Sequence, residues 1–412
     1  MEETINQPLG AVLKGSGIGV AGGKSQKPVY LSSVSSKSPV RVSSMIGEFD
    51  RVLGGGFVPG QVVLLSGEPG IGKSTLITQI AKNMTDKKIL YVSGEESFDQ
   101  VRIRANRMNY VPKNLLMLSE TNVDLLEQAV SGESGIGLII VDSIQTLVSY
   151  ELTGMAGSVG QVRGSAQKLT NLAKNISIPM ILVGHVTKDG TVAGPKVLEH
   201  IVDTVLYLEG DSQHMFRLLN TTKNRFGPVS EIGIFEMTEE GMNEVSNPSE
   251  VFLGQTSESV SGSCVTCVME GYRPILFEIQ ALTSKTSFGY PKRTTSGFNT
   301  NRLQVLIAIL EKRCGLNLSN YDVYLNIAGG FKVSEYACDL AVCLAIASSV
   351  KDKPVKKGTI AFGECGLSGE VRRVSHEDKR IKEAKKLGYK NVISPESIRY
   401  ISQAIKAGLV AV

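Results

Sequence analysis

A short stretch before residue 76 combines three glycines with a lysine and two hydroxyl side chains in a fixed order. It consists of Gly67, Glu68, Pro69, Gly70, Ile71, Gly72, Lys73, Ser74 and Thr75. Glycines lack the Cβ that would obstruct a bound anion, so successive backbone N–H groups can turn inward around a phosphate. An apolar run precedes this stretch and a helical pattern follows it. The full GxxxxGKS pattern in that context predicts a P-loop that binds ATP or ADP.

The polar residues of this loop have separate expected roles. Lys73 is expected to contact the β- and γ-phosphates as a point charge, and Ser74 is expected to hold Mg²⁺. Thr75 is placed to contact the α-phosphate. The helix that follows aims the positive end of its dipole at the same anion.

Two adjacent acids, Glu95 and Glu96, follow an apolar run at residues 88–93. In an open parallel α/β sheet, ligands bind at the carboxyl ends of the strands. A glutamate there can orient and deprotonate the water that attacks the γ-phosphate. Alternatively, one of the two acids begins the helix through Arg107 with a favourable charge at the helix N-terminus. Both interpretations hold if each acid takes one of the two roles.

Two more strand ends carry polar residues. Asp142 follows four apolar residues, the pattern of a Walker B strand, and is expected to hold Mg²⁺ directly or through Ser74 and water. His185 ends the apolar run that begins at Met180 and could sense the γ-phosphate. A histidine at a strand end can equally be structural.

Two cations, Lys223 and Arg225, follow the predicted strand 216–222 in what reads as a turn. Because Lys73 already supplies a cation to the phosphates of its own subunit, these two suit the nucleotide of a neighbouring subunit. That interpretation implies a ring or filament with head-to-tail contacts. The alternative is that both are solvated turn residues.

Two glycine-rich polar segments, around 151–160 and 186–195, leave the same predicted sheet edge and read as flexible. They could line a pore or groove for DNA, or be mobile surface loops. The basic residues available there for phosphate backbones are Arg163, Lys168, Lys188 and Lys196.

The elements that position these residues fall into distinct ranges of the 412-residue chain. We predict a flexible basic arm at 1–44, an α/β ATPase domain at 45–247, a Ser-rich linker at 248–262 and a second α/β domain at 263–412. In the second domain the strongest predictions are an amphipathic helix at 301–313 and a nearly all-apolar helix at 337–350.

Composition limits the class of protein. No apolar run approaches 18 residues and no signal-peptide core begins the chain, so we expect a cytoplasmic protein without a membrane span. The net charge of +4 is too small to establish nucleic-acid binding. Of six cysteines, only Cys264 and Cys267 have metal-like spacing, and without a second pair they are expected to be core residues rather than zinc ligands.

The motifs together resemble those of the bacterial RadA (Sms) family of DNA-repair proteins. The resemblance rests on the P-loop, on the segments 91–97, 141–143, 184–190 and 193–200, and on the KNRFG sequence at 223–227. It implies a RecA-like P-loop ATPase core followed by a Lon-protease-like α+β domain of the ribosomal protein S5 domain 2 type. It also implies a hexameric ring that acts on single-stranded and branched DNA in branch migration with the RecA recombinase.

The resemblance also implies residue roles. Glu95 aligns with the RecA-type catalytic glutamate, Asp142 with the Walker B acid and His185 with a polar γ-phosphate sensor. Lys223 and Arg225 are the signature cations, and the 153–163 and 186–195 segments stand where DNA-contacting loops lie.

Two departures from the family pattern are visible. The family normally begins with a four-cysteine zinc module, but no cysteine precedes Cys264, so either the chain is truncated or it is a variant without the module.

The second departure concerns the Lon-like domain. Ala337 stands where a Lon-type protease has its serine, so proteolysis is not expected, and Cys338 is expected to be a packing residue. The second domain is instead expected to scaffold the ring and to offer a basic surface. That surface comprises Arg372, Arg373, Lys379, Arg380, Lys382, Lys385 and Lys386. An ATP-dependent protease and a nucleotide-switched regulatory ring remain the alternative functions.

Overall fold

A computed structural model of the chain describes Tyr30 and residues 40–185, 195–210, 215–249, 253, 260–286, 289–330 and 332–410. The chain divides into two units, Met1–Pro39 and Val40–Val412, and all elements below belong to the second. Apart from Tyr30, the first 39 residues of the predicted arm lie outside the described residues, and so does Lys188.

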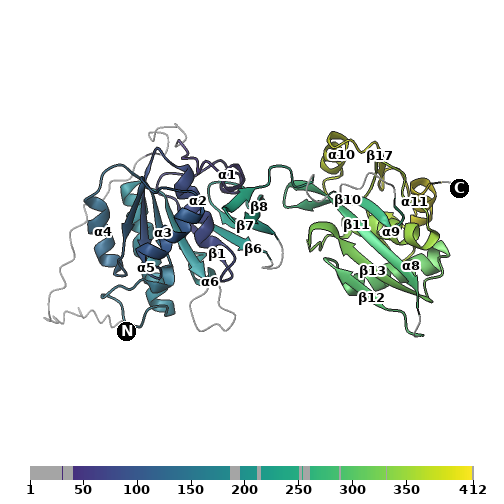
Figure 1. The fold of residues 1–412 in the computed structure, drawn as a ribbon, viewed down its shortest axis with the longest axis horizontal. Helices are drawn as coiled ribbons and strands as arrows, with labels where there is room; N and C mark the ends of the chain where they lie inside the picture. The colour runs from purple at the N-terminus through teal and green to yellow at the C-terminus, as the bar shows by residue number, and fades with distance from the viewer. Residues whose placement is uncertain are drawn as a thin grey trace, which may run out of the picture. The chain divides into compact units, whose positions relative to one another are not determined.

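The first part of this unit is built on a nine-stranded sheet (Figure 1). Its strands are β1 (Val62–Gly67), β2 (Lys88–Ser93), β3 (Leu115–Leu118), β4 (Ile136–Asp142), β5 (Met180–His185), β6 (Thr204–Glu209), β7 (Phe216–Asn224), β8 (Ile232–Thr238) and β9 (Gly241–Glu244). They lie in the order β3-β2-β4-β5-β1-β6-β7-β8-β9. The strands from β3 to β6 are parallel, and β6 to β9 are antiparallel. We call strands β7, β8 and β9 the antiparallel extension.

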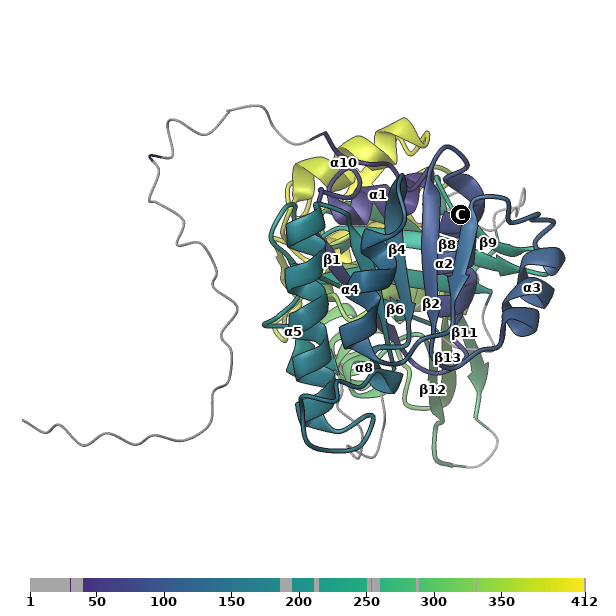
Figure 2. The same ribbon diagram turned by 90° about the vertical axis from the view of Figure 1, so that its left-hand side faces the viewer.

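Helices cover both faces of the parallel strands, which is why those strands read as continuous apolar runs. The helices are α1 (Gly47–Leu53), α2 (Lys73–Asn83), α3 (Phe98–Arg107), α4 (Val123–Ser131), α5 (Val159–Ile176) and α6 (Pro195–Leu198). Helices α1, α2 and α3 share a core with one set of alternating strand residues, and α4 and α5 share a core with the other set. Figure 2 shows α4 and α5 side by side. This arrangement brings the carboxyl ends of β1, β2, β4 and β5 to one edge.

The second part is built on a six-stranded sheet in the order β12-β13-β11-β10-β14-β17. Its strands are β10 (Ser263–Glu270), β11 (Arg273–Lys285), β12 (Arg293–Ser296), β13 (Tyr321–Ile327), β14 (Thr359–Ala361) and β17 (Asn391–Ile393), with a separate pair of β15 (Glu364–Cys365) and β16 (Val371–Arg372). Helices α8 (Thr300–Cys314), α9 (Asp339–Lys351) and α11 (Ile401–Gly408) pack on one face, and α10 (Glu377–Lys386) packs on the other.

The predicted fold class is confirmed: an α/β P-loop core with a mostly parallel sheet is followed by a smaller α+β fold. The nearly all-apolar helix exists as α9 and is buried from residue 339 to residue 348. It starts two residues later than predicted because residues Tyr336–Cys338 form a 3₁₀ turn. Within the described part of the chain, no helix has both the length and the apolar character needed to cross a membrane.

Candidate functional site

The P-loop connects β1 to α2, as predicted, and its last glycine is constrained by its surroundings. Gly72 has a φ of +116°, a conformation that L side chains rarely adopt. A Cβ at this position would lie 2.3 Å from Cε of Met242 and 2.6 Å from Cε of Met237. The backbone conformation therefore favours glycine where α2 begins, and a side chain here would also displace both methionine methyl groups.

Lys73 lies buried at the first position of α2. Its ammonium donates to the backbone carbonyl oxygens of Gly67 (2.8 Å) and Glu68 (2.9 Å). Burial lowers the pKa of Lys73 to about 8, opposed by the charges of Asp142 and Glu95, which raise it. The side chain is thus a cation held inside the loop, as phosphate binding requires.

The depressed pKa of Lys73 predicts proton uptake on nucleotide binding. The charges of bound phosphates favour the ammonium form, so the pKa rises from about 8 toward its ordinary value of 10.5. At pH 8 we expect the uptake of about half a proton per bound MgADP, and a falling apparent affinity as the pH rises further. Calorimetric titrations in two buffers of different ionisation enthalpy measure this quantity. Identical heats in both buffers at pH 8 would contradict the prediction.

Asp142 ends β4, next to the P-loop, and it is almost completely buried. Its Oδ2 accepts hydrogen bonds from the hydroxyls of Ser74 (3.1 Å) and Tyr91 (2.6 Å). Burial, followed by the charge of Asp142, raises the pKa of Tyr91, so the phenol stays protonated and acts as a donor. A serine hydroxyl beside a carboxylate is the oxygen set that Mg²⁺ prefers, so these residues fit the expected metal. The sequence analysis missed Tyr91.

Glu95 lies between two polar side chains at the same sheet edge. Its Oε1 accepts a hydrogen bond from the hydroxyl of Ser143, and its Oε2 lies 3.4 Å from Nε2 of His185. The contact with His185, together with the Ser143 hydroxyl, lowers the pKa of Glu95 against the opposing effect of burial. The carboxylate is therefore ionised and oriented, as a general base must be.

The two adjacent acids have different partners in the structure. Glu96 forms an ion pair with Arg104 of α3, whereas the cap of α3 is Ser97, whose hydroxyl accepts from the N–H of Gln100 (3.3 Å). Glu96 thus supports the helix, and Glu95 faces the nucleotide edge. Ser143 was missed by the sequence analysis, although its position directly after Asp142 was a usable signal.

Lys223 lies within β7, not in a turn as the sequence suggested. Its ammonium donates to the backbone oxygens of Glu199 and Val202 (2.5 and 2.8 Å), at the end of the segment that contains α6. Arg225 follows the strand, is about half exposed, and lies 3.2 Å from Asp203. A role in a neighbouring subunit's site stays a prediction for both cations.

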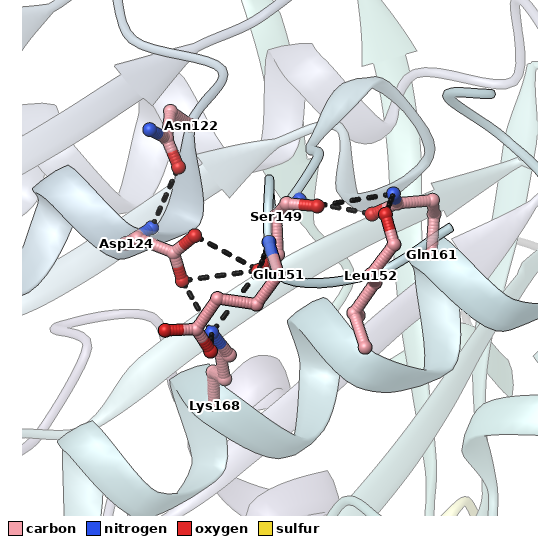
Figure 3. Close-up of polar contacts among 7 residues, drawn as sticks. All are labelled: Asn122, Asp124, Ser149, Glu151, Leu152, Gln161 and Lys168. Carbon is pink, nitrogen blue, oxygen red and sulfur yellow. Dashed lines mark hydrogen bonds and ion pairs between the residues drawn. The ribbon is translucent and has the colours of Figure 1, made fainter. Parts of the chain in front are cut away.

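The first part of the segment that we predicted to be flexible, residues 151–154, is held in place by hydrogen bonds from α5 (Figure 3). Gln161 is buried, and its amide nitrogen donates to the carbonyls of Ser149 (3.1 Å), Leu152 (2.9 Å) and Gly154 (3.2 Å). Its oxygen accepts from the N–H of Ser149 (2.9 Å). The side chain of Leu152 packs beside Gly164 of α5. A Cβ added to Gly164 would lie 2.1 Å from Cδ1 of Leu152. Residues 149–154 therefore form a pre-folded loop.

Lys168 takes part in the same network, as Figure 3 shows. Its ammonium forms ion pairs with Asp124 and Glu151, both at 2.5 Å, and also donates to the hydroxyl of Ser149 (3.0 Å). Lys168 thus fastens the loop to α4 and α5. Contact with DNA would require it to leave these partners. In contrast, Arg163 and Lys196 are exposed, and their DNA contacts stay predictions.

At the start of α9, the position expected for a Lon-type nucleophile holds Ala337, followed by Cys338. Ala337 is buried, and the thiol of Cys338 donates to the carbonyl of Glu335 at 2.9 Å. Burial raises the pKa of Cys338 well above its ordinary value, so the thiol is a poor nucleophile. These observations agree with the expectation that Cys338 is packing.

One residue of the predicted basic surface, Arg380, is buried and not on the surface. Arg380 is fully buried, where its guanidinium pairs with Glu335 and donates to the backbone oxygen of Cys267. Lysines surround Arg380 in the sequence, and nothing in this local pattern indicates that its side chain is buried. Cys264 and Cys267 are both buried in β10, as expected, and burial raises the pKa of each to about 12.

The fold and site define a RecA-like P-loop ATPase. The family model described as an AAA domain matches residues 45–191, and the model described as subunit ChlI of Mg-chelatase matches residues 293–398. DNA repair protein RadA of Bacillus subtilis (strain 168) is 50% identical over 372 residues, which cover 90% of this chain and 81% of that protein. The chain therefore belongs to the RadA family of DNA repair proteins, and the resemblance noted in the sequence is confirmed.

Other relatives give the same result. The RadA proteins of Halalkalibacterium halodurans and Listeria monocytogenes serovar 1/2a are 48% and 47% identical, over 92% and 91% of this chain and 82% of each relative. A crystal structure of the RadB recombinase covers 50% of this chain and 99% of its own at 23% identity, with a TM-score of 0.39, a likeness too loose to carry an argument.

Proposed function

We propose that this protein is an ATP-driven motor that binds single-stranded DNA and processes branched DNA during repair. Within this proposal, Ser74 and Asp142 hold Mg²⁺, Glu95 activates the attacking water, and Lys223 and Arg225 act on the nucleotide of the next subunit in a hexameric ring. Branch migration with the RecA recombinase and a cytoplasmic location are parts of the same proposal, drawn from the family.

The observation that carries the proposal is the direct connection between the catalytic edge and the pre-folded loop. Asp142 and Ser143 are followed by a 3₁₀ turn at Ile144–Thr146 and then by Ser149, the first residue that Gln161 fixes. Gln145 in this turn also donates to the carbonyl of His185 (3.2 Å). A change at the γ-phosphate that moves Glu95 or His185 therefore has a short route to the loop that would contact DNA.

The proposal is tested by ATP hydrolysis with and without an oligo-dT strand over a series of salt concentrations. We expect the strand to stimulate hydrolysis, and we expect its affinity to fall steeply with salt because phosphate contacts release counterions. Arg163→Met should reduce the salt slope by about one, whereas Arg107→Met, at an exposed arginine of α3, should leave it unchanged. A protein that hydrolyses ATP but ignores DNA at low salt would instead be a regulatory ring.

A further inference from the structure

The antiparallel extension carries a buried arginine with no role in the site described so far. Arg217 of β7 has a relative exposure of only 5%. The end of β6 leaves room for it, because a Cβ on Gly210 would lie 2.8 Å from its Cδ. A buried arginine keeps its charge and five N–H donors, so its placement depends on what those donors reach.

Arg217 reaches the P-loop from outside. Its Nε donates to the backbone carbonyl of Ile71 at 3.2 Å, and one terminal nitrogen donates to the carbonyl of Phe216 at 2.9 Å. Ile71 lies two residues before Lys73, in the segment whose N–H groups are expected to surround the β-phosphate. Arg217 therefore contacts the backbone of the nucleotide site without lying in it.

The geometry of the peptide bond gives this contact a consequence. The only cis peptide bond among the described residues is that between Asp142 and Ser143, so the Ile71–Gly72 bond is trans. In a planar trans peptide the C=O and N–H groups point in opposite directions. When Arg217 holds the carbonyl of Ile71 on the outer side, the N–H of Gly72 must point to the other side, into the loop.

The same peptide is also held by the two strands beyond β7. Methyl groups of Met237 in β8 and Met242 in β9 close the space around Gly72 on the Cβ side. One peptide of the P-loop is thus fixed by a hydrogen bond from β7 and by packing from β8 and β9. A rotation of this peptide would break the hydrogen bond from Arg217 to the Ile71 carbonyl.

We propose that Arg217 is a positioning residue for phosphate binding. It fixes the Ile71–Gly72 peptide so that the N–H of Gly72 donates to the β-phosphate, and its positive charge polarises that peptide and strengthens the donor. This inference rests on nucleotide binding at the P-loop and does not depend on DNA. If the inference is correct, replacing Arg217 weakens the binding of every nucleotide that has a β-phosphate, whether or not it also has a γ-phosphate.

The test compares nucleotide affinities of Arg217→Met, Arg217→Lys and Arg293→Met by calorimetry. Arg293 is a matched control, because it too donates to backbone carbonyls, those of Leu318 and Tyr321, but in the second fold. We expect Arg217→Met to weaken the binding of ADP and of a non-hydrolysable ATP analogue by the same factor, about 10- to 150-fold, as the loss of one charge-assisted hydrogen bond implies. The affinity for AMP, which has no β-phosphate, should not change. Arg217→Lys keeps one donor and should recover most of the loss.

Three results would overturn the inference. ADP could bind Arg217→Met as tightly as Arg293→Met, the loss could appear only with the ATP analogue, or AMP could be weakened equally. Should Arg217→Met fail to fold, Arg217→Gln takes its place, because glutamine keeps a polar side chain at this position but removes the positive charge. An ADP affinity of Arg217→Gln equal to that of Arg293→Met would then exclude the role. Stimulation of the wild type by DNA is measured separately, so failure here leaves the proposed function standing.

Discussion

Replacing Glu95 with glutamine should leave ATP binding intact and slow its hydrolysis by about 10²- to 10⁴-fold, the usual contribution of a general base. Glutamine keeps the shape and can still accept from Ser143, but it cannot take a proton from water. Single-turnover hydrolysis of radiolabelled ATP, measured beside ATP affinity, separates the two effects. Normal turnover in this variant would contradict the assignment.

The neighbouring acid provides the control. Glu96→Gln removes one carboxylate of equal size at the next position, but its partner is Arg104 of α3 and not the nucleotide edge. We expect this variant to hydrolyse ATP within a few-fold of the wild-type rate. A large loss in both variants would point to a general electrostatic effect of this segment.

The pH dependence of hydrolysis gives a second measurement on the same residue. Contacts with His185 and Ser143 lower the pKa of Glu95, so the base stays ionised below the ordinary carboxylate range and is lost only as the pH falls through the lowered value. The acid limb of the rate profile should therefore lie below the ordinary glutamate value of 4.5 for as long as the protein stays folded. In His185→Phe that limb should move to higher pH.

Replacing Arg225 with alanine should reduce DNA-stimulated hydrolysis by about 10³- to 10⁵-fold, the range for an arginine supplied to a neighbour's phosphates. The affinity of the variant's own site for ADP should not change, because Arg225 faces Asp203 in its own subunit. Lys174→Ala is the control, since Lys174 also lies near Asp203, at 3.8 Å. The Lys174→Ala variant loses an ion pair with the same aspartate but keeps Arg225.

Mixing two inactive variants tests the trans role directly. A subunit with Arg225→Ala keeps its P-loop, and a subunit with Lys73→Ala keeps its Arg225. A site is complete where the P-loop of the Arg225→Ala subunit faces Arg225 of the Lys73→Ala subunit. The mixture should therefore recover part of the activity that neither variant has alone. Arg225 acting within its own subunit predicts no recovery.

The sequence was sufficient for the fold and for the residues at strand ends. Local patterns placed β2 and β5 at their observed residues, because a buried parallel strand reads as an apolar run and its first polar residue marks the ligand edge. Glu95, Asp142 and His185 were found in this way. The P-loop needed no tertiary information, since its glycines and lysine are contiguous.

The missed residues have partners that are distant in sequence. Arg217 lies 146 positions from Ile71, and Lys168 lies 44 from Asp124, so no local pattern indicates either contact. Nothing in the local sequence distinguishes Gln161 from an ordinary polar residue at a helix start, yet its amide nitrogen donates to three backbone carbonyls. Arg380 looked like a surface cation for the same reason. A cation in a basic helix can be buried when a carboxylate from a distant part of the sequence pairs with it. For Arg380 that carboxylate is Glu335.

The ion pair between the fully buried Arg380 and the partly exposed Glu335 works against a Lon-type active site at the start of α9. Ala337→Ser would supply a hydroxyl, but the cation that pairs with Glu335, two positions before Ala337, is the guanidinium of Arg380, which has no acceptor for a proton. Arg380→Lys would replace a guanidinium that bonds both carboxylate oxygens of the partly exposed Glu335 by an ammonium that lacks this planar, two-point geometry. We therefore expect Ala337→Ser alone to give no peptide cleavage, and Arg380→Lys to lower the free energy of unfolding.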